Sequence, residues 1–294
     1  MARRINLSRF VPYFFLIIPL LIYLIWVIGP TIYTFYLSLT DWDGLSQPHF
    51  IGFQNYEKLF RDPVFYISLK NNIKWLISFI TIPVVAGLAL AMALSRSIPG
   101  ERFFKAGFYS PMVLSLVVSG LIWSWMYHPA NGLINSVLRS VGLDFLAKGW
   151  LSDKNLVIWA IIVVAIWRQV GYVMVLYLAG LAGINPALID ASKIDGCNAW
   201  NTFRHVILPL LTPVTVIVVV ISIIDSLRAF DLVSVMTRGG PYNSSSVLAN
   251  FMYIEAFNNY KMGYGAAISV VLFLISLVFI LFYLTRVLQD ELEY

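Results

Sequence analysis

Charged side chains are scarce in this sequence. Asp, Glu, Lys and Arg make up 12% of the 294 residues, against about 25% in a typical soluble domain. Apolar residues account for 60%, and the mean hydropathy is +0.80. A soluble fold cannot bury so large an apolar share, so the composition excludes an ordinary soluble protein and favours one whose surface faces lipid.

Cysteine and histidine are also nearly absent. Cys197 is the only cysteine, which excludes an intramolecular disulfide. The histidines, His49, His128 and His205, lie far apart and show no metal-ligand spacing. We therefore expect neither redox chemistry nor a metal site.

Motifs for catalysis are missing as well. Gly is nowhere followed directly by Lys, so no G-x-x-x-x-G-K-[ST] loop can hold nucleotide phosphates. Neither a G-x-S-x-G nucleophile elbow nor an H-E-x-x-H helix occurs. We expect no catalytic residue and no cofactor on this chain.

What the sequence does contain is a series of long runs with almost no charge. A helix needs about 20 residues to cross the hydrocarbon of a bilayer. Six runs approach or exceed that length, and only the fourth is interrupted, by Arg168. The runs are 10–40, 75–95, 106–138, 155–189, 206–224 and 262–285. They predict an all-α integral membrane protein with six transmembrane helices.

Basic residues at the amino terminus set the expected orientation. The apolar run that follows them is longer than the h-region of a signal peptide, about 7–15 residues, so it should be retained as the first span. Arg3, Arg4 and Arg9 have no acid nearby, which places the amino terminus in the cytoplasm by the positive-inside rule. Six crossings return the carboxyl terminus to the same side. With this orientation, the cytoplasmic and the outer segments contain nine basic residues each, so their number does not decide between the two orientations. The assignment therefore depends on the first span and on the greater length of the outer segments.

The outer segments, 41–71, 128–154 and 237–261, are rich in Asp, Gly, Asn and Pro and are too short for separate soluble domains. We expect one membrane protein composed of a cytoplasmic tail and first transmembrane helix, 1–40, and a core, 70–287. No internal repeat and no broken helix is evident in the sequence.

A polar stretch, ALIDASKIDGCNAWNTFRHVILPLL, interrupts the apolar pattern between the fourth and fifth spans. Asn185 can cap a helix that has Pro186 at its first position. Gly196 is suited to end that helix in the left-handed conformation, and Asn198 can cap a second helix that leads into the fifth span. Composition alone fits an ordinary amphipathic loop on the lipid headgroups.

The order of residues in this stretch, however, resembles the EAA motif of ABC importer permeases. That motif runs E-A-A, two residues, D-G-A, a stretch that often contains F, and then I-x-L-P. This chain has Asp, Ser, Cys and Val where the motif has Glu, Ala, Ala and Ile. The matching positions are Asp190-Ala191-Ser192, Asp195-Gly196-Cys197, Phe203 and Val206-Ile207-Leu208-Pro209.

Four further stretches resemble the carbohydrate-uptake branch of the same permeases, so that the resemblance covers most of the chain. They are FIGFQNY, YLAGLAGINPALIDA, TRGGPYNSSS and YGAAISVVLF. The resemblance implies a type I importer bundle in which the segment 186–209 contains a cytoplasmic coupling helix. The residues it assigns to ATPase coupling are Asp190, Ala191, Asp195, Gly196, Phe203 and Pro209.

The resemblance also implies a function. The chain would be the permease subunit of an ATP-driven importer in a bacterial or archaeal cytoplasmic membrane, moving a sugar, oligosaccharide or related polyol by alternating access. The implied partners are a second homologous permease, two copies of a cytoplasmic ATPase that hold ATP and Mg, an extracytoplasmic solute-binding protein and membrane lipid. No nucleic-acid partner is expected, because the basic residues are spread along the loops.

Polar residues within the predicted spans are candidates for the cargo path, since buried charges in membranes usually face the bundle interior or water. An alternative is that Asp225, Arg228 and Asp231 pair with one another at a spacing of three and only hold the helices together. The candidates are Arg168, Gln169 and Tyr172 in the fourth span and Ser222, Asp225, Ser226, Arg228 and Asp231 in or just after the fifth.

Two other functions stay open on the sequence. One is an ion-gradient-coupled secondary transporter without an ATPase partner, in which Asp225, Arg228 and Asp231 would relay a proton or an ion. The other is a membrane anchor or assembly protein without cargo.

Overall fold

The computed structural model describes residues 11–95 and 99–292, and these residues are mostly helical. Within them, four helices are long and apolar enough to cross a membrane, and two bent helix pairs raise the number of candidate spans to six. The only strand-like feature of the described residues is an isolated antiparallel bridge between Thr40 and Phe50. The prediction of an all-α membrane protein with six spans is confirmed.

One compact unit comprises residues 1–62 and 252–271. It contains α1 (Val11–Tyr23), a π-helical turn (Leu24–Ile28), α2 (Gly29–Leu37), α3 (Gln54–Arg61), a second π-helical turn (Ile254–Asn258) and the beginning of α15 (Met262–Leu292). The side chain of Asn55 donates hydrogen bonds to the carbonyls of Ser38, at 3.0 Å, and Thr40, at 2.7 Å. These bonds tie α3 to the chain that leaves α2.

The second unit comprises 63–251 and 272–294 and contains both predicted functional regions. Its helices include α4 (Pro63–Leu94), α5 (Glu101–Val113), α6 (Leu116–Met126), α7 (Leu133–Ser140), α8 (Val157–Ala182), α9 (Pro186–Ile194), α10 (Ala199–Thr202), α11 (Leu208–Leu210), α12 (Thr212–Leu227), α13 (Asp231–Met236) and α14 (Leu248–Tyr253). A short 3-10 turn (Asp144–Leu146) follows α7, and a π-helical turn (Phe203–Ile207) joins α10 to α11.

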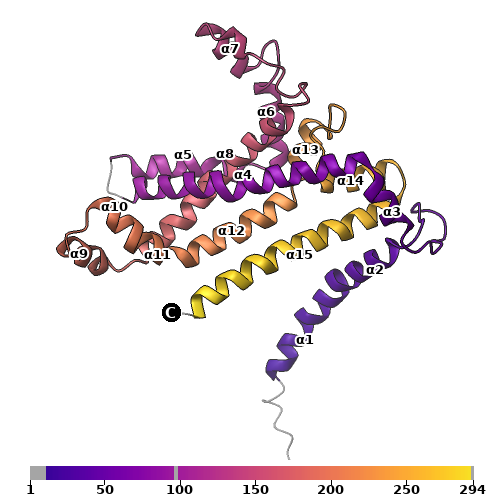
Figure 1. The fold of residues 1–294 in the computed structure, drawn as a ribbon, viewed down its shortest axis with the longest axis horizontal. Coiled ribbons are helices and arrows are strands. Elements are labelled where there is room, and N and C mark those ends of the chain that lie inside the picture. Colours follow the sequence, from indigo (N-terminus) through magenta and orange to yellow (C-terminus); the bar gives the residue numbers. More distant parts are fainter. Residues whose placement is uncertain (1–10, 96–98, 293–294) are drawn as a thin grey trace, which may run out of the picture. The chain divides into compact units, whose positions relative to one another are not determined.

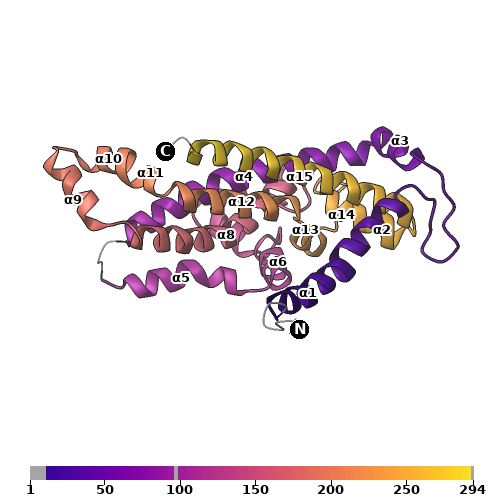
Figure 2. The same ribbon diagram turned by 90° about the horizontal axis from the view of Figure 1, so that it is seen from below.

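Helices α4 and α8 lie side by side and form the centre of this second unit (Figures 1 and 2). They pack tightly at Gly87, where an added Cβ would lie 2.5 Å from Cγ1 of Val173. Ile161 and Val164 of α8 are completely buried in the same core as Trp75 and Phe79 of α4. Glycine at this contact therefore brings the two helices closer together than any side chain would allow.

Two of the expected spans are broken. The third bends by 101° between α5 and α6, and the fifth bends by 67° between the segments Ala199–Leu210 and Thr212–Met236. At the first break Leu114 is extended, and the hydroxyl of Ser115 caps α6 by accepting the N–H of Val118 at 3.2 Å. The expectation that the spans contain no broken helix is therefore wrong. Long charge-free runs reveal apolar length but not where a helix stops and restarts.

Some expectations stay predictions. Arg3, Arg4 and Arg9, on which the orientation depends, lie outside the described residues. The proposed division into 1–40 and 70–287 also stays a prediction, although the structure groups 252–271 with residues 1–62.

Candidate functional site

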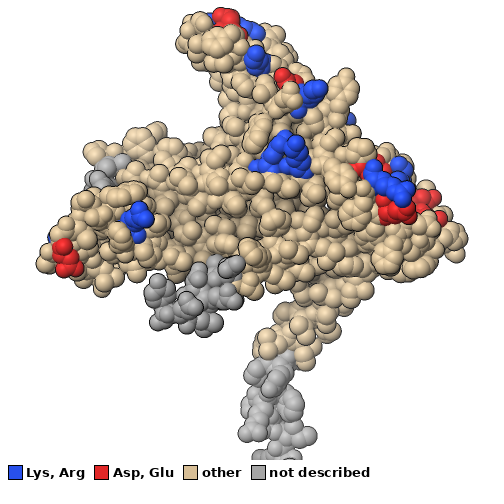
Figure 3. All heavy atoms as spheres, viewed as in Figure 1, with Lys and Arg blue, Asp and Glu red and all other residues tan. Residues whose placement is uncertain are grey.

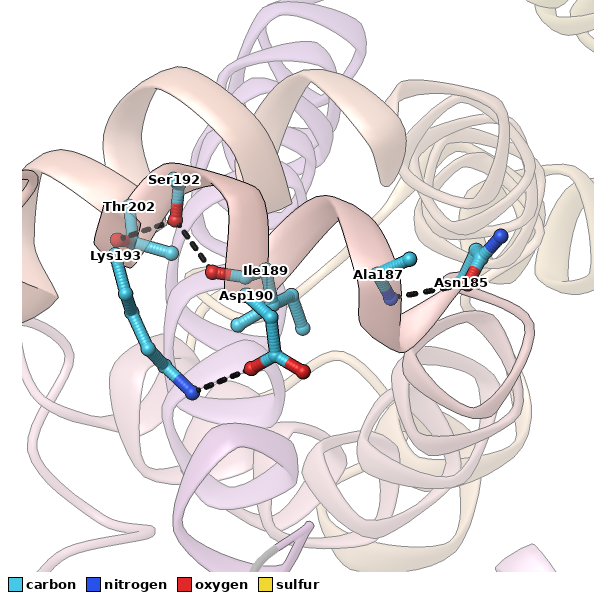
Figure 4. Close-up of polar contacts among 7 residues, drawn as sticks. All are labelled: Asn185, Ala187, Ile189, Asp190, Ser192, Lys193 and Thr202. Carbon is cyan, nitrogen blue, oxygen red and sulfur yellow. Dashed lines mark hydrogen bonds and ion pairs between the residues drawn. The ribbon is translucent and has the colours of Figure 1, made fainter. Parts of the chain in front are cut away.

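The segment 186–209 forms the helix–turn–helix that its local signals predict. The side chain of Asn185 accepts the backbone N–H of Ala187 at 3.0 Å, and Pro186 occupies the first helical position of α9 (Figure 4). Gly196 follows with a φ of 82°, in the left-handed region. Asn198 then accepts the N–H of Asn201 at 2.8 Å and so caps α10. Both caps and the glycine turn are confirmed.

The two helices of this segment are joined by a buried pair of hydroxyls. Oγ of Ser192 lies 3.0 Å from Oγ1 of Thr202, and it also donates to the carbonyl of Ile189 at 2.7 Å (Figure 4). Both side chains are almost completely buried. Serine at a position where the EAA motif has alanine therefore adds a cross-helix hydrogen bond.

The outer side of α9 is polar. Asp190 accepts a hydrogen bond from the ammonium group of Lys193 at 2.9 Å, and their side chains are 67% and 64% exposed. Ala191 and Asp195 are exposed as well. In Figure 3 acidic atoms gather over α9, whereas the surface over α12 shows no charge. An exposed ion pair is weak and exchanges its partners easily, so Asp190 is available to a basic group on another protein.

The inner side of the segment is anchored in the helix bundle. Phe203, Ile207 and Leu211 pack in one apolar cluster with residues of α4 and α8, among them Ala91 and Tyr177. Pro209, in contrast, is exposed. The segment thus combines a polar outer helix with an inner helix that is fixed to the bundle.

Most of the second predicted set of residues lies around a cleft of about 330 Å³. Five of its eight members line this cleft: Arg168, Gln169, Asp225, Arg228 and Asp231. They come from α8, from the end of α12 and from the start of α13. The fold therefore brings together polar groups that lie on three separate elements of the chain.

The other three candidates do not line the cleft. Ser222 and Ser226 are completely buried, and Ser226 donates its hydroxyl proton to the carbonyl of Ile223 at 2.8 Å. Tyr172 is partly buried and lies one turn beyond Arg168 on α8. These three residues belong to the helix packing around the cleft.

The guanidinium of Arg168 holds the break between α5 and α6. Its Nε donates to the carbonyl of Pro111 at 3.3 Å, and its Nη2 donates to those of Met112 and Leu114 at 3.2 and 2.9 Å. A helix that ends inside a membrane leaves carbonyls without partners, which other groups must satisfy. Arg168 therefore stabilises the broken third span in addition to lining the cleft.

The remaining charges of the cleft are not joined in ion pairs. Nε2 of Gln169 donates to Oδ2 of Asp225 at a long 3.4 Å. No N–O distance within 4.0 Å links Arg168, Asp225, Arg228 or Asp231 to one another in the part of the chain that the structure describes. Pairing at a spacing of three is thus not the arrangement here, and the carboxylates keep free hydrogen-bonding capacity.

Three aromatic residues of the cleft were not singled out from the sequence. Trp75 and Phe79 of α4 and Phe230, which precedes α13, form part of its lining. The rings of Trp75 and Phe79 lie 6.1 Å apart. Their spacing of four, beside the buried polar residues Asn71 and Asn72, was a usable signal.

Together the fold and these two regions define a membrane transport protein, with a polar helix–turn–helix at its surface and a polar cleft between its helices. The whole chain, residues 2–294, matches the family described as binding-protein-dependent transport system inner membrane component. The protein belongs to this family of ABC transporter permeases, which confirms the resemblance seen in the sequence.

Individual relatives agree with this assignment. A probable ABC transporter permease protein of Pyrococcus horikoshii is 39% identical over 93% of this chain and 94% of its own length. A probable starch degradation products transport system permease protein of Thermoanaerobacterium thermosulfurigenes is 35% identical over 95% of this chain and 96% of its own. These similarities give no support to an ion-gradient transporter.

The fold is also similar to that of a solved protein. A chain of a bacterial alginate ABC transporter, crystallised in complex with an alginate pentasaccharide-bound periplasmic protein, superposes with a TM-score of 0.83 at 21% identity, covering 95% of this chain and 94% of the other. At that identity the similarity bears on the fold alone.

Proposed function

We propose that this chain is the permease subunit of an ATP-driven importer of a sugar, oligosaccharide or related polyol. The observation that carries this proposal is a continuous connection from a polar surface helix to the cleft. Membership of the permease family supports import, and the relative named for starch degradation products supports a carbohydrate cargo.

The connection begins at α9, which would dock on a cytoplasmic ATPase through Asp190 and Asp195. Carboxylates on a compact helix–turn can form charge-assisted hydrogen bonds with basic groups of a partner. Ser192 and Thr202 join α9 to α10, so that a displacement of α9 is passed on to the inner helix. Ala191 and Gly196 leave the docking surface free of bulky side chains.

From α10 the displacement continues through Phe203 and the exposed Pro209 to α12. The carboxyl-terminal part of α12 carries Asp225, and Arg228 follows it, so both lie at the cleft. A hydrogen bond of 3.2 Å between Tyr177 of α8 and Thr215 of α12 connects the two helices along the way. Closure of the ATPase would thereby change the shape of the cleft, which is what alternating access requires.

The partners follow from this division of labour. Two copies of a cytoplasmic ATPase would bind ATP and Mg and hydrolyse the nucleotide, because this sequence has no phosphate-binding loop. A second homologous permease would complete the route, and an extracytoplasmic solute-binding protein would deliver the cargo. Both termini and α9 would lie in the cytoplasm. The cargo would pass Arg168, Gln169, Asp225, Arg228 and Asp231, with Tyr172, Ser222 and Ser226 supporting the wall of the path.

Co-purification from detergent tests the docking role. The solubilised chain should bring down a protein with a phosphate-binding loop, and Asp190→Lys should release most of it because a like charge then faces the basic groups of the partner. Uptake of radiolabelled neutral oligosaccharides into cells should fall in parallel.

Glu57→Lys is a matched control, because Glu57 is a similarly exposed acid, 62% accessible, that pairs with Arg61 on α3. This variant should keep the ATPase bound. Retention of the ATPase by Asp190→Lys, or uptake that continues without any ATPase, would contradict the proposal.

A further inference from the structure

The cleft contains equal numbers of positive and negative side chains, but these are not in direct contact. Two cationic side chains, Arg168 and Arg228, face two anionic ones, Asp225 and Asp231, so the lining has no net charge. Arg168 also interacts favourably over a longer range with both carboxylates. The balance is therefore a property of the whole cleft and not of separate pairs.

The hydrogen-bonding capacity left over is of both kinds. Nε and Nη2 of Arg168 are used on backbone carbonyls, while its Nη1 has no partner among the described residues. In the same part of the chain, the side chains of Arg228 and Asp231 make no hydrogen bond, and Oδ1 of Asp225 makes none either. Guanidinium groups only donate and carboxylates only accept, so the cleft offers donors and acceptors side by side.

We propose that this cleft selects uncharged polyhydroxylated cargo and discriminates against cargo that carries a carboxylate or an ammonium group. The inference rests on the proposed import function and specifies the chemistry of its path. A hydroxyl is donor and acceptor at once, so neighbouring hydroxyls can bind an arginine and an aspartate together without adding charge.

A charged cargo meets a penalty of either sign. A carboxylate can only accept hydrogen bonds, and it would be repelled by Asp225 and Asp231. An ammonium group can only donate, and it would be repelled by Arg168 and Arg228. Because the lining is already balanced, an extra charge of either sign has no partner left in the cleft. A charge without a partner is costly at membrane depth, so such cargo is disfavoured.

The aromatic residues of the lining suit the same cargo. Trp75 is 3% exposed, and its indole N–H is buried without a partner among the described residues. Phe79 and Phe230 add apolar surface. Sugar-sized ligands are commonly held by apolar walls with a few convergent polar groups, and a ring with C–H faces and hydroxyl edges has that character.

The test uses the complete transporter in proteoliposomes with its binding protein. A screen of radiolabelled neutral disaccharides first identifies one that is taken up. Its analogue with one hydroxymethyl group oxidised to a carboxylate and its analogue with one hydroxyl replaced by an amine are then compared with it. For each variant, uptake of a charged analogue is divided by uptake of the neutral sugar. This uptake ratio is then compared with the same ratio in the unmodified protein. Because both proteins receive cargo from the same binding protein, its preference cancels.

Asp231→Asn makes the cleft net positive and should raise the ratio for the carboxylate analogue roughly tenfold. Arg228→Gln makes it net negative and should raise the ratio for the ammonium analogue by a similar factor. The double variant restores neutrality and should return both ratios to within about twofold of the starting protein. Asp144→Asn, which changes the charge of the chain outside the cleft, should leave both unchanged.

The outcomes separate the two proposals. If the unmodified transporter takes up no neutral sugar, carbohydrate import itself fails. If neutral uptake persists and the single variants leave both ratios unchanged, only the charge-balance inference fails. If a variant abolishes all uptake, quenching of tryptophan fluorescence by the same three probes, with the binding protein omitted, supplies the ratios and decides in the same way.

Discussion

Charged residues are treated in opposite ways at α9 and at the cleft. At α9 the opposite charges of Asp190 and Lys193 are paired directly, one turn apart, on an exposed surface. At the cleft, Asp225, Arg228 and Asp231 have the same spacing along the chain but form no direct pair among the described residues. Sequence spacing alone therefore does not decide whether charges pair.

The difference follows from what surrounds each set. Around α9 water solvates both partners, so forming or breaking the pair changes the free energy little. At the cleft the helix ends at Leu227 and a new one begins at Asp231, so the side chains no longer share one helical face. Arg168 is in turn fixed by three carbonyls of another helix. Charged groups thus form a weak direct pair at α9, whereas at the cleft their hydrogen-bonding groups stay available.

The largest effect should come from Arg168→Met. The substitution removes three hydrogen bonds from a charged donor and takes from the carbonyls of Met112 and Leu114, at the α5–α6 break, the partner that Arg168 supplies, which should cost about 3 kcal/mol or more. Thermal unfolding of the detergent-solubilised chain measures the loss. Arg168→Lys keeps the charge but not the planar guanidinium group, so its stability should lie between those of the unmodified protein and the methionine variant. Unchanged stability in the methionine variant would show that the break is held by other contacts.

Gly196→Ala should have the next largest effect. An added Cβ at this position meets no atom within 4 Å, so only the left-handed backbone opposes it, at a cost of roughly 1–2 kcal/mol. Local opening of α9 and α10, measured by amide hydrogen exchange, should increase, while the core of α8 stays protected. Gly196→Asn, which tolerates the left-handed conformation better, should be milder. Equal effects of alanine and asparagine would argue against backbone strain as the cause.

Thr202→Val should weaken the connection between α9 and α10 by about 1 kcal/mol, because it removes the buried bond to Ser192 but keeps the shape of the side chain. ATPase activity stimulated by cargo should fall more than ATP binding does. Thr31→Val is a suitable control, since the hydroxyl of Thr31 bonds to the carbonyl of Val27, one turn earlier in the same span. If Thr31→Val lowered the cargo-stimulated ATPase activity by the same amount, the bond of Thr202 would have no specific part in the connection.

Lys193→Ala should have the smallest effect. The pair with Asp190 is about two-thirds exposed, so its loss should change the free energy of unfolding by no more than roughly 0.5 kcal/mol. Unfolding in the presence and absence of 0.5 M salt provides the check, because screening should reduce even this difference. A loss above about 1 kcal/mol would show that this exposed pair stabilises the protein as much as a buried hydrogen bond does. The proposed difference between α9 and the cleft would then be wrong.

The sequence predicts best where the signal is local. Asn185, Pro186, Gly196 and Asn198 each act on the backbone beside them, and the structure has both caps and the glycine turn where expected. The apolar length of the spans is also a local property. These features required no knowledge of neighbouring helices.

Where distant segments meet, the sequence was less informative. Nothing near Arg168 in the chain indicates that it would bind the carbonyls of Pro111 to Leu114, and the break there was missed for the same reason. Trp75 reaches the cleft from a helix about ninety positions earlier than Arg168. The polar candidates were recognised because a charge in an apolar run is conspicuous, whereas an aromatic residue in such a run is not.

The close contact at Gly87 limits how this protein can move. With no space for a methyl group between α4 and Val173, neither helix can slide past the other without first separating. Helices α4 and α8 therefore form one rigid unit. If α9 transmits the motion of a partner as we propose, the displacement would then appear as rotation of the neighbouring helices and not as sliding between α4 and α8. A larger residue in place of Gly87 would force these two helices apart and weaken that rigid unit.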